Sequence, residues 1–339
     1  MLAMHMANEL LTPAVAGLFL SIAAVFLFAA SWRVRTGLPN DRVVLMGVMG
    51  AFVFAAQMIN FPVLPGTSGH LGGGVLLAIL LGPHAGTLVI AAILIVQCLI
   101  FQDGGLLALG TNIFNLGIIP CYLGGGLFAV LAGKSPSSRR LYVAVFVATL
   151  AGMVAGAAMV PLEVWMSGRL TVPLADFAAV MVGLHVLVGL GEAIITFLVI
   201  GYVVRVRPQL LGEVSARLSA ARAGMSRTGV AVSLSVVALL LACVVSLWAS
   251  SSPDALESIA SEESAVARVE PAGEPAVQQT TQWQERTAPL PDYQVPGLSE
   301  SLGTSVSGLI GTVVTLLVVW GAARWLRRSG REHALPPTG

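Results

Sequence analysis

Long runs of apolar residues constrain this chain more than any other feature. A helix needs about 20 apolar residues to cross roughly 30 Å of hydrocarbon, and nine stretches approach or reach that length. Among 339 residues only 10% are charged, whereas a soluble domain carries charge on about a quarter. The sequence therefore predicts an all-α, polytopic membrane helix bundle of seven spans plus a two-span C-terminal module. The predicted spans cover residues 12–32, 43–59, 70–82, 85–102, 107–133, 141–161, 174–204, 228–249 and 303–323.

The ends of two spans are less sharply defined than the others. Residues 70–82 and 85–102 are short and are separated only by Gly82-Pro83-His84, so they could form a tight helical hairpin or a partly re-entrant segment. The first apolar run is expected to be a retained span. A secretory signal would have basic residues before its apolar run. Here no basic residue precedes the run, and the acidic Glu9 stands before it.

The basic residues predict the orientation. With the N-terminus outside, 15 of the 18 Lys and Arg residues fall in cytoplasmic loops. The positive-inside rule therefore selects an outer N-terminus and a cytoplasmic C-terminus in the cell's inner (plasma) membrane. This orientation places His5 and the loop leading to His70 on the same outer face. The segregation of charge across the spans is that of a protein embedded in membrane lipid, which is therefore an expected partner. The net charge of +1 gives no indication of a nucleic-acid partner.

Two modules can be distinguished along the chain. Residues 1–204 hold seven spans joined by short loops, and residues 205–227 form a basic cytoplasmic connector. Residues 228–339 hold two further spans around an outer segment, 250–302. That segment carries nine acids against two arginines and is rich in Pro, Ser and Gln. With few apolar residues to bury, most of it is expected to lack a fixed structure.

The candidate chemistry is metal binding by two histidines on the outer face. A histidine directly behind a chain-initiating methionine, such as His5 behind Met4, can offer three nitrogens to one ion: the terminal amine, its own amide and its ring. His70 could supply a fourth. Nitrogen-rich tetragonal sites favour nickel(II) or copper(II), whereas zinc prefers a tetrahedral ligand set. Without further support, a solvated chain-end histidine and a loop histidine with ordinary hydrogen bonds are the commoner interpretations.

Four separated motifs in order resemble the CbiM/NikM family. They are residues 4–11 (MHMANELL), 66–73 (GTSGHLGG), 97–115 (from Gln97 to Asn115) and 185–193 (HVLVGLGEA). Members of this family are the substrate-binding membrane components of energy-coupling-factor (ECF) transporters for cobalt and nickel. The likeness covers residues 4–204 and implies binding of divalent nickel or cobalt, with no permanent cofactor and no enzymatic activity.

The second module resembles the small accessory component, CbiN/NikN, fused to the end of the chain. The resemblance is carried by Ser252-Pro253-Asp254-Ala255-Leu256-Glu257, which follows the eighth span. The signature of that family reads P-D-G-L-E, so Ala255 stands in place of a glycine.

Carried onto this sequence, the metal ligands of the family fall on Met4 through its amine, His5 through its amide and ring, and His70. Met1-Leu2-Ala3 would remove the free amine from Met4. We therefore expect translation to begin at Met4, which mass spectrometry of the N-terminus would decide. The resemblance does not distinguish nickel from cobalt.

Several polar residues in or near the spans have two interpretations. Asn60, Gln97, Asn112 and Asn115 could line the metal chamber or support the His70 loop, or they could make ordinary interhelical hydrogen bonds. Asp103, on the outer side, is expected to be a solvated loop acid.

His185 and Glu192 share a helical face and are functional candidates because they lie within the membrane. A structural role that ties their helix to the bundle is the favoured interpretation over direct metal ligation.

A stripe of small residues, Gly47, Ala51 and Ala55, permits close helix contact. It could pack inside the bundle. The family resemblance implies instead that it docks on the transmembrane coupling (T) subunit. On that interpretation, Ala51→Trp abolishes complex assembly and leaves metal binding intact.

The energy source is expected to lie in partner subunits. The only lysine, Lys134, lacks the G-x-x-x-x-G-K-[ST] pattern of a phosphate-binding loop. The family supplies ATP hydrolysis through two ATP-binding-cassette (ABC) ATPase subunits. Two alternatives are a proton-coupled secondary cation transporter that uses Glu192 and an intramembrane metalloenzyme, although no H-E-x-x-H motif supports the latter.

Overall fold

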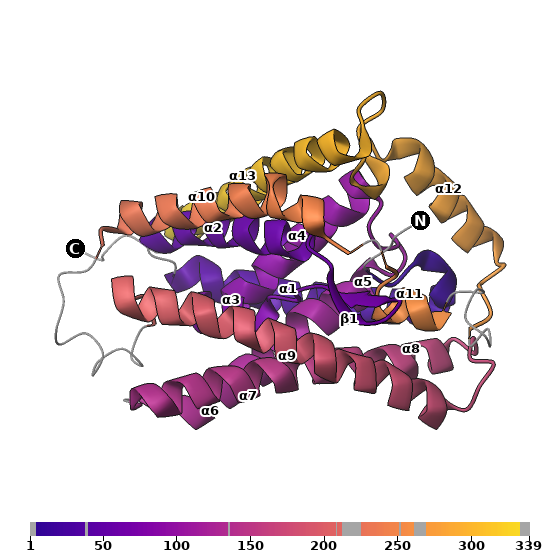
Figure 1. Cartoon of the computed structure of the whole chain (residues 1–339), viewed down its shortest axis with the longest axis horizontal. Coiled ribbons are helices and arrows are strands. Elements are labelled where there is room, and N and C mark those ends of the chain that lie inside the picture. Colours follow the sequence, from indigo (N-terminus) through magenta and orange to yellow (C-terminus); the bar gives the residue numbers. More distant parts are fainter. Residues whose placement is uncertain are drawn as a thin grey trace.

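The computed structural model describes residues 5–37, 40–134, 136–207, 209–211, 225–250, 252–260 and 269–332. Within these residues, seven helical segments are long and apolar enough to cross a membrane, and α2 is a shorter apolar helix. The chain is therefore a multi-pass helical membrane protein, as predicted (Figure 1). The long elements of the first module are α1 (Pro13–Gly37), α2 (Asn40–Gln57), α4 (Pro83–Phe101), α7 (Ser138–Ala157) with α8 (Met159–Met166), and α9 (Leu174–Val206).

The third predicted span is only partly helical. Helix α3 (Gly74–Leu81) has eight residues, about 12 Å at 1.5 Å per residue, and the three residues before it, 71–73, are buried but not helical. The guanidinium of Arg42 donates a hydrogen bond to the carbonyl of Leu80, so α3 ends beside the basic start of α2. The segment thus ends beside the start of α2, and it consists of non-helical chain followed by a short helix rather than one full helix.

The fifth predicted span contains a π-helical stretch. It begins as α5 (Leu109–Asn112), continues through the π-helical η2 (Ile113–Ile118) and η3 (Pro120–Gly124), and ends as α6 (Gly125–Ala132). Wide turns of this kind are rare and often occur at functional sites. Asn112 and Asn115 lie at the start of this stretch.

A small β-hairpin carries His70. Strands β1 (Phe61–Leu64) and β2 (Thr67–Gly69) pair antiparallel with Phe61 opposite Gly69. Gly66, in the turn, has a φ of 77°, which glycine adopts without steric cost. His70 follows β2 directly, so the hairpin fixes the position of its backbone.

The C-terminal helices pack against α2. Helix α10 (Arg227–Cys243), continued by η5 (Val245–Trp248), and α13 (Glu300–Glu332) both contact α2, and Figure 1 shows the three running side by side. A Cβ on Gly47 would lie 3.1 Å from the Trp320 Cβ on α13, and Ala51 and Ala55 are buried. The small-residue stripe therefore packs within this chain, which is the first of its two predicted roles.

The described part of the outer segment is folded. It contains α11 (Ala255–Ala260), α12 (Pro275–Thr287) and η6 (Pro291–Tyr293), which lie at one end of the molecule with β1, α5 and η1 (Asn8–Leu10) (Figure 1). The expectation of a mostly unstructured segment is therefore wrong for residues 252–260 and 269–302. The segment is anchored by a few buried apolar side chains, such as Leu256 and Val269, and by single residues with specific contacts, such as Gln284 and Tyr293. Most of the basic connector, residues 212–224, lies outside the described residues.

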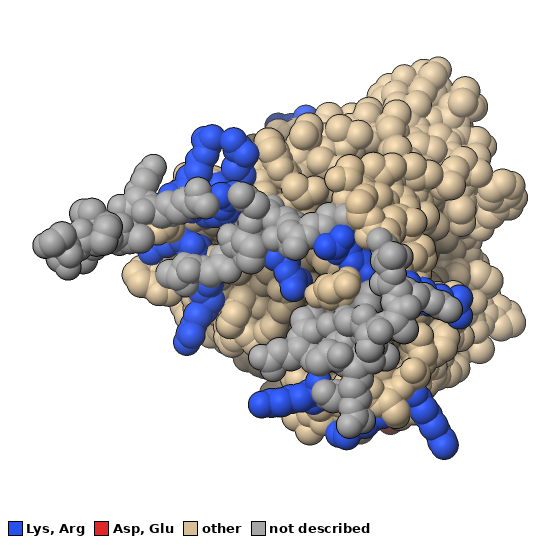
Figure 2. Space-filling model, turned by 90° about the vertical axis from the view of Figure 1, so that its left-hand side faces the viewer, with Lys and Arg blue, Asp and Glu red and all other residues tan. Residues whose placement is uncertain are grey.

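The basic side chains gather at the opposite end. Figure 2 views this end directly and shows Lys and Arg side chains around its rim. Helices α6 and α9 end here, next to Lys134, Arg205 and Arg207. The outer segment and the basic rim thus lie at opposite ends of the bundle, in agreement with the alternation of charge along the sequence.

Candidate metal centre

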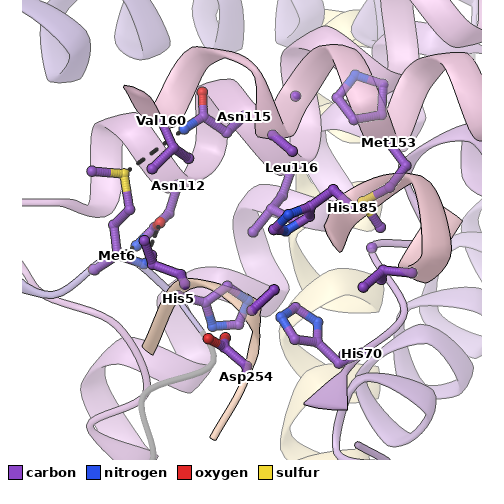
Figure 3. A pocket seen from close by; sticks show the side chains of 18 of the residues that line it. His5, Met6, His70, Asn112, Asn115, Leu116, Met153, Val160, His185 and Asp254 are labelled. Atoms are coloured by element: carbon purple, nitrogen blue, oxygen red, sulfur yellow. Dashed lines mark hydrogen bonds between the residues drawn. The ribbon is translucent and has the colours of Figure 1, made fainter. Parts of the chain in front are cut away.

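A cavity of about 70 Å³ lies near the end of the bundle that the outer segment covers. Its walls come from the chain start, the His70 loop, the π-helical stretch, α7, α9 and the start of α11. In Figure 3, His5, His70, His185 and Asp254 surround one space, and Met6 lies beside them.

The structure brings His5 and His70 together from positions 65 residues apart. Their ring centroids are 5.2 Å apart with the planes inclined by 60°. The His5 side chain is buried and His70 is half-buried. Met4, the third predicted ligand residue, lies outside the described residues.

The two ring nitrogens of His5 have different surroundings. Nδ1 is 2.9 Å from Oδ1 of Asp103, whereas Nε2 is buried and has no hydrogen-bond partner among the described residues. If Nδ1 carries the proton and donates a hydrogen bond to the carboxylate, Nε2 keeps a free electron pair. A histidine held in this way by a carboxylate is the usual arrangement around a metal-binding imidazole.

This conformation bears on the predicted chelate. A ring that closes through the residue's own amide nitrogen, Cα, Cβ and Cγ must return to the ion through Nδ1, because Nε2 is on the far side of the imidazole. In the structure Nδ1 faces Asp103. Binding through both the amide and the ring of His5 therefore requires the imidazole to leave Asp103.

Asp103 is buried, so its predicted role as a solvated loop acid is wrong. Its side chain is about 1% exposed, and the Tyr293 hydroxyl donates to Oδ2 at 2.7 Å. Burial raises the pKa of Asp103. The charge of His5 and the hydrogen bonds from His5 and Tyr293 lower it by more, so the net pKa is below its usual value. Asp103 therefore presents a carboxylate to His5.

Glu192 holds the loop that follows His70. Its two carboxylate oxygens accept hydrogen bonds from the backbone N–H groups of Gly72 and Gly73, each at 3.0 Å, and Gln57 donates to the Gly72 carbonyl at 2.9 Å. Non-helical backbone inside a membrane bundle needs such partners, because an unpaired polar group there is costly. The favoured structural role of Glu192 agrees with these contacts.

His185 points into the same cavity as His70 (Figure 3). Its Nδ1 lies 2.9 Å from the Met181 carbonyl one turn earlier in α9. The ring is therefore fixed by its own helix and forms part of the cavity wall.

The four predicted supporting amides lie in different places. Asn112 accepts from the Met6 N–H at 3.0 Å and donates to the Met6 carbonyl at 3.2 Å, which fixes the residue after His5. Asn115 lines the cavity and donates to Glu163 at 2.8 Å. Gln97 supports the Gln57 side chain at 3.0 Å. Asn60 is buried outside the cavity lining, and its backbone carbonyl accepts a hydrogen bond from the Ser250 N–H.

The accessory-like segment reaches the cavity through Asp254. Ser68, two residues before His70, donates its N–H to the Pro253 carbonyl at 2.8 Å, so the segment extends the hairpin. Asp254 Oδ1 accepts from the Glu257 N–H at 2.7 Å and so caps α11. Burial raises the pKa of Asp254 to about 6.

The sequence interpretation named Asp254 only as part of a signature and assigned no role to Tyr293. Asp103 lies inside the 97–115 motif and Asp254 inside the 252–257 signature, so an acid within a family motif was the available signal. No comparable signal marks Tyr293. Among the described residues, no group of three or more His, Cys, Asp and Glu side chains is arranged to hold a metal ion. A complete site therefore needs further donors, such as backbone or terminal nitrogens.

Comparisons with known proteins agree on one family. Residues 5–210 match the family model described as the cobalt uptake substrate-specific transmembrane region, CbiM, and residues 228–328 match the PDGLE domain. A protein of Archaeoglobus fulgidus named as a fused nickel transport protein, NikMN, is 32% identical over 96% of this chain and 99% of its own length. A fused nickel transport protein of Lactiplantibacillus plantarum, LarMN, is 27% identical over 94% of this chain and 97% of its own length.

A solved structure shares the fold of more than half of this chain. The crystal structure of a truncated transition metal transporter is 28% identical, with a TM-score of 0.52, and the alignment covers 59% of this chain and 97% of the other.

Proposed function

The chain belongs to the CbiM family of cobalt uptake transmembrane regions, with a PDGLE domain fused behind it, and we propose that it captures divalent nickel or cobalt for import. It is thus a metal-transport membrane protein. The observation that carries the proposal is the meeting of His5 and His70, at 5.2 Å between ring centroids, at a cavity into which the buried His5 ring brings an unpaired nitrogen.

The proposed ligands are nitrogens of Met4, His5 and His70. The described part of the site is rich in imidazole and has apolar walls, which suits nickel and cobalt better than magnesium or calcium, since those ions prefer several oxygen ligands. A chelate that uses the His5 amide also requires the His5 ring to turn from Asp103 toward the ion. The rearrangement would let metal binding exchange a hydrogen bond for a coordinate bond.

The proposed orientation places the cavity outside and the basic rim in the cytoplasm. An ion captured at the outer cavity then needs energy to reach the cytoplasm. In the proposed mechanism that energy comes from partners, namely an ECF T subunit and ABC ATPase subunits, and the metal is cargo and not a resident cofactor.

Docking on the T subunit through Gly47, Ala51 and Ala55 stays part of the proposal. Because α13 covers Gly47 in this chain, such docking requires α13 to move away from α2 or the T subunit to approach along another side of α2. Ala51→Trp would disturb the packing of α2 within the chain itself, since Ala51 is 1% exposed.

Transport assays separate this function from its main alternative. Vesicles that contain the chain with its T and ATPase partners should take up ⁶³Ni²⁺ only when ATP is supplied to the cytoplasmic side. A proton-coupled transporter would instead take up nickel without partners under a pH gradient. The contacts of Glu192 with two backbone N–H groups favour the first outcome, because they assign that carboxylate a structural task. Uptake by the isolated chain would contradict the proposal.

A further inference from the structure

A second cavity, away from the candidate metal centre, lies at the basic end of the molecule. It has a volume of about 370 Å³ and lies between α2, α10 and the C-terminal end of α9. Figure 1 shows α10 beside α2. The hydroxyls of Tyr202 on α9 and Ser233 on α10 are 2.7 Å apart, so these two helices are also joined here. This groove therefore lies where the first module meets the first helix of the second.

The walls of the groove are mostly apolar and follow one face of α10. The lining residues recur at the spacing of a single helical face, namely Thr228, Ala231, Val232, Ser235, Val236 and Leu239. Helix α2 adds Val44 and Leu45. Val44, Val232 and Val236 are 48%, 55% and 48% exposed, so the described part of the chain leaves this apolar face largely uncovered.

The length of the groove matches one leaflet of a bilayer. Thr228 and Leu239 are 11 positions apart in α10, which is about 16 Å at 1.5 Å per residue. The hydrocarbon layer is roughly 30 Å thick, so the groove runs from the basic membrane surface to about the midplane. A spanning helix of a partner would need a face across the full thickness. An acyl chain of one leaflet ends at the midplane, so the length favours a lipid.

The basic end of the groove carries a cation. Arg207 directly follows α9 and lines the groove. Among the described residues its guanidinium has no carboxylate partner, and it makes one long hydrogen bond, from Nη1 to the Met225 carbonyl at 3.3 Å. A guanidinium has five N–H donors and its geometry suits phosphate oxygens. Figure 2 shows further Lys and Arg side chains around the same rim.

We propose that this groove binds one anionic phospholipid, with an acyl chain along α10 and the phosphate at Arg207 and Thr228. Basic pockets between helices at the cytoplasmic membrane surface commonly recognise anionic headgroups. The bound lipid fills the space between the modules and so supports the packing of α9, α10 and α2. The inference goes beyond metal capture, and its test needs neither a metal ion nor partner subunits.

Thermal unfolding of the full chain in detergent tests the headgroup. Phosphatidylglycerol, which is anionic, should raise the unfolding midpoint more than zwitterionic phosphatidylethanolamine does. Arg207→Gln should raise the phosphatidylglycerol concentration needed for half of this effect by about fivefold or more. Arg205→Gln is the matched control, because Arg205 is exposed, lies two positions earlier and does not line the groove. Equal effects of the two lipids, or equal losses in the two arginine variants, would overturn the inference.

Filling the groove tests the acyl chain. Val236→Trp should lower the amount of phosphatidylglycerol that stays bound in native mass spectrometry. Val237→Trp, at an exposed neighbour outside the groove lining, should bind the lipid as the wild type does. If Val236→Trp fails to unfold cooperatively, Ala231→Leu provides a smaller filling of the same groove. Unchanged lipid binding in a folded groove variant would overturn the inference.

Two further arms separate other occupants. Inorganic phosphate should leave the unfolding midpoint unchanged, because it lacks the acyl chain; a shift as large as that from phosphatidylglycerol would overturn the lipid assignment. With the T subunit added, Val236→Trp should still assemble. Loss of assembly together with unchanged phosphatidylglycerol binding would assign the groove to a partner helix and overturn the inference.

Discussion

Replacing Glu192 by glutamine tests how the His70 loop is held. The carboxylate accepts two backbone hydrogen bonds, from Gly72 and Gly73, both at 3.0 Å, and its side chain is buried. A glutamine keeps one acceptor oxygen and places an NH₂ group opposite the other N–H donor. One buried donor then loses its partner, at a cost of about 1–3 kcal/mol.

That cost should appear as weaker nickel binding, because His70 is only two residues from Gly72. If the loop must recover its bound shape before it can hold the ion, about 1–3 kcal/mol corresponds to roughly a 5- to 150-fold loss of affinity. Glu192→Ala removes both acceptors and should cost about twice as much free energy. Isothermal titration with Ni²⁺ and thermal unfolding in detergent would measure both effects.

The matched control is Thr196→Val, one turn further along α9. Thr196 is fully buried, and its hydroxyl has no hydrogen-bond partner among the described residues. The substitution therefore changes a buried polar group on the same helix without removing a bond to the loop, and nickel affinity should stay at the wild-type level. Unchanged affinity in Glu192→Gln, or an equal loss in Thr196→Val, would refute the assigned role.

Two glycines provide further predictions. Gly73→Ala places a Cβ at a position with a φ of 78° and only 2.6 Å from Val53 Cγ1. The left-handed conformation alone costs about 1–2 kcal/mol, so the unfolding midpoint and the nickel affinity should both fall. Wild-type values for both would contradict the described loop. Gly311→Leu adds atoms where even a Cβ would lie 2.1 Å from Phe54. It should separate α13 from α2, which loss of a disulfide cross-link between cysteines introduced on the two helices would report; a cross-link as efficient as in the Gly311 parent would contradict the packing.

The parts of the fold that could be predicted from sequence are those that depend on hydrophobic length. A bilayer demands about 20 apolar residues for each helix, so seven of the nine predicted spans agree with long apolar helical segments. Residues 70–82 form an exception because their backbone is satisfied by side chains from elsewhere. Glu192 and Gln57 replace the missing helical bonds, and apolar length contains no information about such partners.

The outer segment shows a second limit of composition. Its low content of apolar residues predicts little structure. However, Gln284 alone donates to the carbonyls of Cys98 and Gly104, at 3.0 and 2.8 Å, and Tyr293 stacks on Phe101. These are specific contacts with another module, and their strength depends on geometry that composition does not record.

The candidate site could be predicted in part. Charge alternation placed His5 and His70 on one face, and the structure brings their rings together. The surroundings of the His5 nitrogens could not be predicted, because Asp103 and Tyr293 lie in separate, distant segments. Whether Met4 contributes an amine depends on the start of the mature chain, which mass spectrometry of the N-terminus measures directly.

The central claim is that His5 and His70 capture one nickel or cobalt ion together. The most direct measurement is a Ni²⁺ and Co²⁺ titration of purified full-length protein whose N-terminus has been identified by mass spectrometry, with His70→Ala and His333→Ala measured in parallel. We expect one ion per chain for the wild type and for His333→Ala, whose tail position is remote in sequence from the site. His70→Ala should lose this tight binding. Wild-type affinity in His70→Ala would contradict the account.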